Sequence, residues 1–340
     1  MSQIAFVAIG RNEGERLKRC LRSLRKASDS VIYVDSGSTD GSIEFARSLG
    51  VEVLELDVSR GFTMARARNA GWKRLLEITP SPELVHFIDG DCELIWEWVP
   101  RAITFLDQNP GVAAVCGRRR EMHPEASFYN LLCEIEWNTP IGEAHASGGD
   151  VLMRIPPLES VGGFNEDLIA FEEPDLCRRI RNKGWKIWRL DEDMTRHDAN
   201  ILTFAQWWKR HERAGYGAMV ITDNCREEGD TTSGELFAKQ VRSPRIWLFS
   251  MFLALLLGIP LASLVEGWTG AVAILFLLAI VFVAQALRIA WFSRGRAPNL
   301  PTAILYGVFT MIAKLPQSLG QLHYARDRAK GRKAVLIEYK

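Results

Sequence analysis

The sequence lacks several features that mark common functional classes. Its 42 Lys and Arg residues nearly balance its 41 Asp and Glu residues, and the net charge of +1 argues against a protein that binds nucleic acid through a general basic field. No GxGxxG or Walker-type loop follows any strand-like segment, so neither a Rossmann cofactor site nor a P-loop is indicated. The sequence also has no internal repeat and no low-complexity tract.

Cysteine is scarce, and its spacing is not that of a zinc site. The six cysteines are Cys20, Cys92, Cys116, Cys133, Cys177 and Cys225. None belongs to a CxxC pair or to a Cys/His spacing of zinc type, and all lie in apolar or helical stretches. We therefore expect reduced thiols in a cytosolic environment. No secretory signal precedes the first strand-like run, which agrees with that expectation.

The first half of the chain alternates short apolar runs with segments of helical periodicity. Strands are predicted at Ile4–Ile9, Val31–Val34, Val51–Leu56 and Leu84–Ile88, and helices at Leu17–Leu24, Ser42–Leu49 and Met64–Leu76. This order predicts an α/β fold with a mainly parallel central sheet. Because parallel strands need crossover connections, successive loops return to the same edge of the sheet. We expect the loops after the first, second and fourth strands to converge on one cleft.

The fourth predicted strand ends in Asp89-Gly90-Asp91, two carboxylates separated by one glycine. Chemistry in open α/β sheets gathers at the carboxyl ends of the strands. Two acids there form an oxygen-rich site suited to a hard divalent cation, which can hold a diphosphate. A solvated Asp-Gly turn is the ordinary alternative for an isolated Asp-x-Asp. An EF-hand is not indicated, because Pro100 stands at the twelfth loop position in place of glutamate.

Polar residues also fill the neighbouring loops. Asn12-Glu13 follows the first strand, and Asp35 stands directly at the end of the second. The segment Ser38-Thr39-Asp40 is more typical of turn and helix-capping residues. Arg66 and Arg68 lie on a predicted helix that begins near the same edge. These arginines either form a solvated helical face or bind phosphate or acid oxygens.

Taken together, these segments resemble glycosyltransferase family 2. The matching blocks, in chain order, are Asn12-Glu13, Val34–Gly41, Ala67–Gly71, Asp89–Asp91, Gly148-Gly149, Gly162–Glu166 and Phe171–Arg179. The resemblance implies a GT-A fold over residues 1–222, a nucleoside-diphosphate sugar as donor and Mg²⁺ or Mn²⁺ as cofactor.

The resemblance also implies roles for individual residues. Asp35 would contact the nucleoside base, in a pocket lined by Asn12 and Glu13. Asp89 would lie against the ribose and the metal, and Asp91 would bind the metal. The donor-binding set it implies is Asn12, Glu13, Asp35, Arg68, Asp89 and Gly90. His197, which follows a predicted strand at Trp185–Leu190, either completes the metal set with Asp89 and Asp91 or lies in a surface loop.

The family ends this half with an acidic Glu-Asp pair, and the second acid is the catalytic base. Here the pair is Glu172-Glu173, so the resemblance assigns the base to Glu173, one methylene longer, with Glu172 as the second catalytic candidate. Pro174 would fix the backbone immediately after it. Inverting sugar transfer needs a base within hydrogen-bond reach of the acceptor hydroxyl. The ordinary alternative is acidic charge at a helix N-terminus.

Residues 201–220 predict an amphipathic helix. Its basic and aromatic residues are typical of a helix that lies on a membrane surface, and packing is the alternative. The residues predicted to face the membrane surface or the acceptor are Gln206, Trp207, Lys209 and Arg210.

A linker is predicted at 223–243, and residues 244–340 predict a membrane region. The apolar stretches 246–265 and 268–287 are each long enough to cross a hydrocarbon core of ~30 Å. The stretch 303–322 contains Lys314 and Pro316, which favours an interfacial or re-entrant helix. Arginines flank the outer ends of the first two stretches and Glu266 lies between them, so we expect a hairpin with both ends, and a basic tail, in the cytoplasm.

These features predict an inverting glycosyltransferase at the cytoplasmic face of the inner membrane. Its acceptor would be a lipid-linked or surface glycan, such as an exopolysaccharide or lipopolysaccharide, and no nucleic-acid partner is expected. A polyprenyl-phosphate sugar transferase is the first alternative. A membrane scaffold that binds nucleotide sugars without turning them over is the alternative from outside the enzymes.

Overall fold

The structure is a computed structural model that describes residues 4–77 and 82–332. It divides into two compact units, Met1–Leu202 and Thr203–Lys340, each described here by itself. The boundary falls before the predicted amphipathic helix and not at residue 222. That helix therefore belongs to the second unit.

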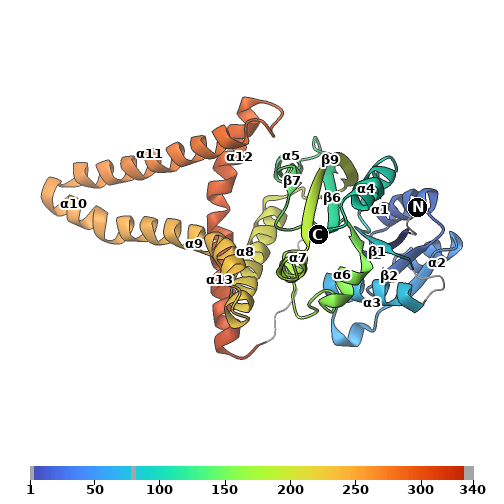
Figure 1. Ribbon diagram of the computed structural model, residues 1–340. Helices are drawn as coiled ribbons and strands as arrows, with labels where there is room; N and C mark the ends of the chain where they lie inside the picture. Colours follow the sequence, from blue (N-terminus) through green and yellow to red (C-terminus); the bar gives the residue numbers. More distant parts are fainter. Residues whose placement is uncertain (1–3, 78–81, 333–340) are drawn as a thin grey trace. The chain divides into compact units, whose positions relative to one another are not determined.

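In the described part of the first unit, nine strands form one mixed sheet (Figure 1). The strands are β1 (Ile4–Gly10), β2 (Val31–Asp35), β3 (Glu52–Glu55), β4 (Leu84–Asp89), β5 (Cys92–Leu94), β6 (Val112–Glu121), β7 (Gly142–Glu143), β8 (Val151–Arg154) and β9 (Lys186–His197). Their order is β3-β2-β1-β4-β8-β6-β9-β5, and β7 pairs with β9. The first four strands pair in parallel as predicted, whereas β8 runs antiparallel to both β4 and β6.

Helices cover this sheet. They are α1 (Glu15–Ala27), α2 (Ser42–Ser48), α3 (Met64–Glu77), α4 (Trp98–Gln108), α5 (Phe128–Trp137), α6 (Ile155–Ser160) and α7 (Glu172–Asn182), with a short 3₁₀ turn, η1, at Val58–Arg60. The predicted apolar face of α1, formed by Leu17, Leu21 and Leu24, is fully buried. Helix α3 lies against β1 because Gly71 has no side chain; a Cβ there would lie 2.2 Å from a methyl group of Val7.

The register of the parallel strands aligns their carboxyl ends. Gly10 at the end of β1 pairs with Asp35 at the end of β2, and Ile9 pairs with Asp89 at the end of β4. The backbone N–H of Gly90 donates to the carbonyl of Ile9 at 2.7 Å. The prediction that these three loops converge at one edge is therefore confirmed.

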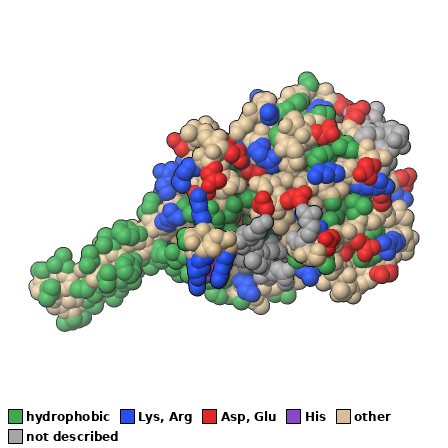
Figure 2. Space-filling model, turned by 90° about the horizontal axis from the view of Figure 1, so that it is seen from below, with side chains coloured by type: hydrophobic (Ala, Val, Ile, Leu, Met, Phe, Trp, Pro, Cys, Tyr) green, Lys and Arg blue, Asp and Glu red, His purple; other side chains and the backbone are tan. Residues whose placement is uncertain are grey.

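The second unit is helical. Its helices are α8 (Phe204–Glu227), α9 (Thr231–Leu253), a π-helical turn η2 (Ala254–Gly258), α10 (Ile259–Glu266), α11 (Trp268–Ser293), α12 (Leu300–Ile312) and α13 (Lys314–Ala329). Helices α9 to α10 and α11 form the two arms of a hairpin (Figure 1). Figure 2 shows hydrophobic side chains over the hairpin.

Two helical stretches of the described chain are long and apolar enough to cross a membrane, 231–266 with 36 residues and 268–293 with 26. Both predicted apolar stretches lie inside them. The third predicted segment, 303–322, does not form one helix, because α12 ends at Ile312 and α13 begins at Lys314. Of the predicted basic tail, Arg326 and Arg328 lie in the last turn of α13, whereas Lys333 lies outside the described residues.

The prediction of a linker at 223–243 is wrong. Helix α8 continues to Glu227, and α9 begins at Thr231 after a short turn. The carboxylate of Asp230 accepts a hydrogen bond from the backbone N–H of Ser233 at 3.0 Å and caps α9. The Glu, Gly, Thr and Ser residues of this stretch are therefore helix-end and capping residues, which have the same composition as a flexible linker.

Candidate active site

The first two loops are joined by Asn12, a predicted donor-pocket residue, and by Ser38, Thr39 and Asp40, which were predicted to be turn and capping residues. The Asn12 side-chain oxygen accepts from the backbone N–H of Thr39 at 2.8 Å, and the Asn12 N–H donates to the hydroxyl of Ser38 at 2.9 Å. The carboxylate of Asp40 accepts from the Gly14 N–H at 2.8 Å. The two loops therefore form one cross-linked wall of the strand edge.

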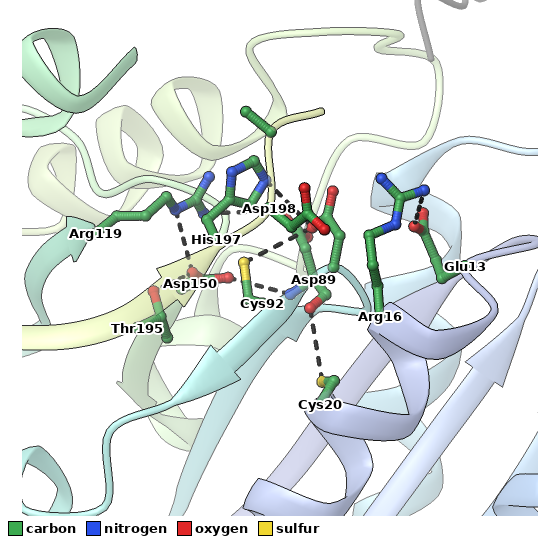
Figure 3. A network of polar contacts seen from close by, with 12 residues as sticks. Glu13, Arg16, Cys20, Asp89, Cys92, Arg119, Asp150, Thr195, His197 and Asp198 are labelled. Atoms are coloured by element: carbon green, nitrogen blue, oxygen red, sulfur yellow. Dashed lines mark hydrogen bonds and ion pairs between the residues drawn. The ribbon is translucent and has the colours of Figure 1, made fainter. Parts of the chain in front are cut away.

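Asp35 is fully buried inside this wall. It accepts hydrogen bonds from the Tyr33 hydroxyl at 2.7 Å and from the backbone N–H groups of Gly37 and Ser38 at 2.8 and 2.7 Å. Burial and the hydrogen bond to Asp35 raise the pKa of Tyr33, so the phenol stays a donor. Asp35 shapes the turn, and its contact with a nucleoside base remains a prediction. Glu13, the other predicted pocket residue, forms an ion pair with Arg16 at 2.7 Å (Figure 3).

The Asp89–Asp91 turn is held close to β1 because its middle residue is glycine. A Cβ at Gly90 would lie 3.0 Å from the carbonyl oxygen of Ile9, which already accepts the Gly90 N–H. The role of Gly90 is therefore to allow this close approach, which fixes where the two carboxylates stand. A direct contact between Gly90 and a donor remains a prediction.

A buried guanidinium, Arg68, connects the predicted metal turn to the predicted catalytic pair. It lies 2.8 Å from an Asp89 oxygen, 3.0 Å from Glu172 and 3.1 Å from Glu173. Burial acts to lower the pKa of Arg68, but the three carboxylates outweigh it and raise that pKa. One positive charge thus holds acids from β4 and α7 together. Arg68 was predicted to bind the donor, whereas its observed partners are these acids.

The two acids at the start of α7 have different environments. The Glu172 side chain is 2% exposed and is bound to Arg68, whereas that of Glu173 is 15% exposed. Burial and the neighbouring Glu172 raise the pKa of Glu173 to about 7, against the lowering effect of Arg68. A carboxylate with a pKa near neutrality that reaches solvent is suited to accept a proton. Glu173, rather than Glu172, therefore stays the predicted base.

Asp91 meets His197 on the neighbouring strand. An Asp91 carboxylate oxygen lies 3.2 Å from His197 Nε2, and the Cys92 sulfur lies 3.7 Å from that same oxygen. Cys92 and His197 are paired residues of β5 and β9. Carboxylate and imidazole together fit a divalent cation. Asp89 fits less well, because its oxygens face Arg68 and, at 3.7 Å, Arg119.

Asp150 and Arg119, which hold the Asp89–Asp91 turn in place, were not predicted from the sequence. Asp150 is fully buried and accepts from the Asp89 backbone N–H at 3.1 Å, the Thr195 hydroxyl at 2.6 Å and Arg119 Nε at 3.1 Å (Figure 3). Burial acts to raise the pKa of Asp150, but Arg119, Thr195 and the Asp89 N–H lower it below its ordinary value. The available signal was its position directly after the matched Gly148-Gly149 block.

Comparison with known proteins identifies this unit. The model of the family described as Glycosyl transferase family 2 matches residues 7–147. Residues 7–147 of the first unit form a glycosyltransferase family 2 domain. The family and the named relatives of the chain support sugar transfer as the activity.

Two curated relatives and one solved structure extend the similarity of the family 2 domain. Glycosyltransferase AglE of Haloferax volcanii is 25% identical over 225 residues, which cover 62% of this chain and 71% of AglE. The O-antigen chain rhamnosyltransferase RfbN of Salmonella typhimurium is 24% identical over 187 residues, 51% of this chain and 58% of RfbN. The chain therefore spans less than two thirds of RfbN.

The solved structure is a mannosyltransferase, PcManGT, from Pyrobaculum calidifontis in complex with GDP-Man and Mn²⁺. It superposes with a TM-score of 0.55 at 17% identity and covers 94% of this chain and 87% of its own. This similarity concerns the fold, and it confirms the predicted GT-A fold with its mainly parallel central sheet.

The predicted surface role of Trp207 is wrong. Its side chain is 1% exposed and packs against Phe204, His211 and Phe309 of the second unit, with ring centroids 5.4, 4.5 and 5.3 Å away. Gln206 accepts from the Thr203 N–H at 3.0 Å as part of a capping box. Helical periodicity identifies an apolar face but does not tell whether protein or lipid covers it. Lys209 is exposed and Arg210 is half-buried, and their roles remain predictions.

Replacing Asp150 with asparagine should destabilise the family 2 domain by about 3–5 kcal/mol, the usual cost of removing one partner from a buried ion pair. The carboxylate's lowered pKa means that this stabilisation is present at neutral pH and is lost as the pH falls through that lowered value. Thermal unfolding of the purified chain at pH 7 measures the effect. The control is Asp29→Asn, because the Asp29 side chain is 97% exposed. Equal melting temperatures for Asp150→Asn and wild type would contradict the assigned role.

Proposed function

We propose that the protein is a membrane-anchored, inverting glycosyltransferase that takes a sugar from a nucleoside-diphosphate donor with the help of Mg²⁺ or Mn²⁺. The observation that carries this proposal is the Arg68 cluster. One buried guanidinium holds Asp89 of the Asp-Gly-Asp turn and the Glu172-Glu173 pair in one cluster. A protein that only binds nucleotide sugars has no need of a solvent-reaching carboxylate with a pKa near 7 beside that turn.

Different residues would act on the donor and on the acceptor. Asp91 and His197 would hold the cation, which when bound neutralises charge that develops on the leaving diphosphate. Asp150 and Arg119 fix the turn that carries Asp91, through the Asp89 backbone and side chain. Glu173 accepts the proton of the acceptor hydroxyl as that oxygen attacks the sugar, while Arg68 holds Glu173 in place.

The acceptor proposed is a lipid-linked or surface glycan. The name of RfbN, an O-antigen chain rhamnosyltransferase, supports this class. The helical hairpin supports it as well, because an acceptor in the membrane requires the enzyme to stay at the bilayer. At 1.5 Å per residue, helices of 36 and 26 residues reach about 54 and 39 Å, beyond the ~30 Å of a hydrocarbon core.

We propose that the family 2 domain lies on the cytoplasmic side. Arg242 and Arg245 precede the apolar part of the first arm, and Arg288, Arg294 and Arg296 lie at the end of the second. Lys and Arg in short flanking segments are retained in the cytoplasm. The turn at Glu266, between the two arms, would then lie on the opposite side.

Single cysteines in a variant lacking the six native ones test this topology. We expect Glu266→Cys to react with a membrane-impermeant thiol reagent on intact cells, and Thr232→Cys and Lys330→Cys to react only after permeabilisation. All three positions are exposed in the structure, so the Glu266 site serves as the control for reagent access. Labelling of the Lys330 site in intact cells would mean that α12 and α13 carry the chain across the membrane.

A donor screen tests the proposed function. The detergent-solubilised chain is melted in the presence of Mn²⁺ and each of a panel of nucleoside-diphosphate sugars. We expect at least one donor to raise the melting temperature, and this stabilisation to disappear when Mn²⁺ is removed. If no nucleotide sugar stabilises the protein with Mn²⁺ or Mg²⁺, the proposal fails at its first step.

A further inference from the structure

Three side chains of different chemistry meet at the start of β5. One oxygen of Asp91, the sulfur of Cys92 and one ring nitrogen of His197 all lie within 4.8 Å of one another, and all three residues are buried. The antiparallel pairing of β5 with β9 sets Cys92 directly opposite His197. Directly paired residues of antiparallel strands project their side chains on the same face of the sheet. The pairing therefore creates a mixed oxygen, sulfur and nitrogen group from residues far apart in sequence.

The spacing of these atoms is that of a tetrahedral metal site. Zinc bonds are about 2.0–2.1 Å to nitrogen or oxygen and about 2.3 Å to sulfur, which places tetrahedral ligands about 3.3–3.6 Å from one another. The observed separations are 3.2 Å between Asp91 and His197 and 3.7 Å between Asp91 and Cys92. These two separations are close to the tetrahedral values, and the third, between Cys92 and His197, is within 4.8 Å.

A sulfur ligand beside an imidazole favours a softer cation than the Mg²⁺ or Mn²⁺ proposed for donor binding. Mg²⁺ binds oxygen ligands in octahedral geometry and has little affinity for sulfur. A thiolate with an imidazole favours Zn²⁺, and Cd²⁺ shares that preference for sulfur. The ring of Trp137 lies edge-on to the His197 imidazole, with centroids 4.6 Å apart, and so fixes the plane of this ligand.

We propose that Asp91, Cys92 and His197 form a binding site for a thiophilic divalent cation, with Zn²⁺ as the biological ion and Cys92 as a ligand. Coordination of Zn²⁺ releases the thiol proton to water and leaves a fourth position open. Because Asp91 is also the proposed ligand of the donor cation, Zn²⁺ and a donor-bound Mg²⁺ or Mn²⁺ exclude each other. Inhibition of sugar transfer by Zn²⁺ follows from this and rests on the proposed function. The site itself rests on these three side chains and does not depend on sugar transfer.

Metal titration of the full chain tests the site without any sugar donor. The detergent-solubilised protein is stripped with a chelator and titrated with Cd²⁺, and the ultraviolet charge-transfer absorption of the thiolate–Cd²⁺ bond is recorded. Zn²⁺ affinity is measured by competition with a chromophoric chelator. We expect one Cd²⁺ per chain with a charge-transfer band. Cys92→Ser should lose the band and bind Zn²⁺ at least about 10–100-fold more weakly.

Two further variants keep the test decisive. Cys116→Ser is the matched control, since Cys116 is also a buried cysteine of the same sheet, and it should keep both the band and the Zn²⁺ affinity. His197→Ala should keep the band and lose Zn²⁺ affinity, which tests the site if Cys92→Ser folds poorly. Absence of the band in the wild type, or Zn²⁺ affinity unchanged in His197→Ala, would overturn the proposal. No donor is present, so these outcomes are independent of the donor screen.

Discussion

Replacing Glu173 with glutamine is expected to lower turnover by about 10²–10⁴-fold, the usual contribution of general-base catalysis. Glutamine has nearly the same shape but cannot accept the proton of the acceptor hydroxyl. Donor affinity should change little, because proton transfer takes place only on the way to the transition state. Steady-state kinetics with a donor found in the screen, together with calorimetry of donor binding, measures both quantities.

The pH dependence gives a second readout of the same group. Because the pKa of Glu173 is raised to about 7, the base is protonated and inactive below that pH. We expect kcat/KM to rise with pH and to level off above about 7, and this limb should be absent in Glu173→Gln. Stability changes in the opposite sense. The folded state binds the Glu173 proton more tightly than the unfolded chain does, because folding raises the pKa from 4.5 to about 7. The contribution of Glu173 to the free energy of unfolding therefore falls as the pH rises from 4.5 to about 7.

Two control variants make the Glu173 result specific. Glu159→Gln changes an exposed acid on α6 and should leave turnover unchanged. If Glu172→Gln proves the more damaging change, the two acids of the pair have exchanged roles. Turnover that survives in Glu173→Gln would favour a polyprenyl-phosphate acceptor, because a phosphate oxygen attacks without losing a proton to a base.

Replacing Asp91 with asparagine is expected to abolish the cation-dependent part of donor binding. The substitution removes the negative charge that would face the cation and retains the shape of the side chain. The fold should persist, because the segment after β9 is bound to the backbone of Asp91 and not to its side chain. The backbone carbonyl of Asp91 accepts the Asp198 N–H at 3.0 Å. Calorimetry of donor binding with and without Mn²⁺ measures the effect.

Asp198 provides the matched control for this prediction. It is the next residue after His197, and its carboxylate pairs with Arg19 at 3.2 Å, outside the proposed cation ligands. In Asp198→Asn, donor affinity should still differ between solutions with and without Mn²⁺. If Asp91→Asn keeps it too, Asp91 does not bind the donor cation.

Local sequence patterns predicted the strands and helices whose arrangement follows from their order along the chain. The four parallel strands and their crossover helices follow from apolar runs and helical periodicity, and their carboxyl ends align because parallel strands require it. The Asp-Gly-Asp turn was found because it ends one of those runs. The Glu172-Glu173 pair was found through the family resemblance, and the structure brings it to the same guanidinium as Asp89.

The parts that were missed depend on contacts between distant strands. Asp150 lies under the turn because β8 pairs antiparallel with β4, and Cys92 faces His197 because β5 pairs with β9. No spacing along the chain reveals either pairing, so the sequence showed no zinc-type arrangement. A helix was predicted at 201–220 and is observed at 204–227, but the packing of Trp207 depends on Phe309, far along the chain.

Release of nucleoside diphosphate from the donor tests the central claim most directly. The solubilised wild type and the Glu173→Gln and Asp91→Asn variants are incubated with the donor from the screen, Mn²⁺ and a membrane extract that supplies acceptors. We predict diphosphate release by the wild type that requires both the cation and the extract and falls at least about 100-fold in either variant. Binding of the donor by the wild type without release of nucleoside diphosphate under any of these conditions would contradict the claim and identify a binding protein.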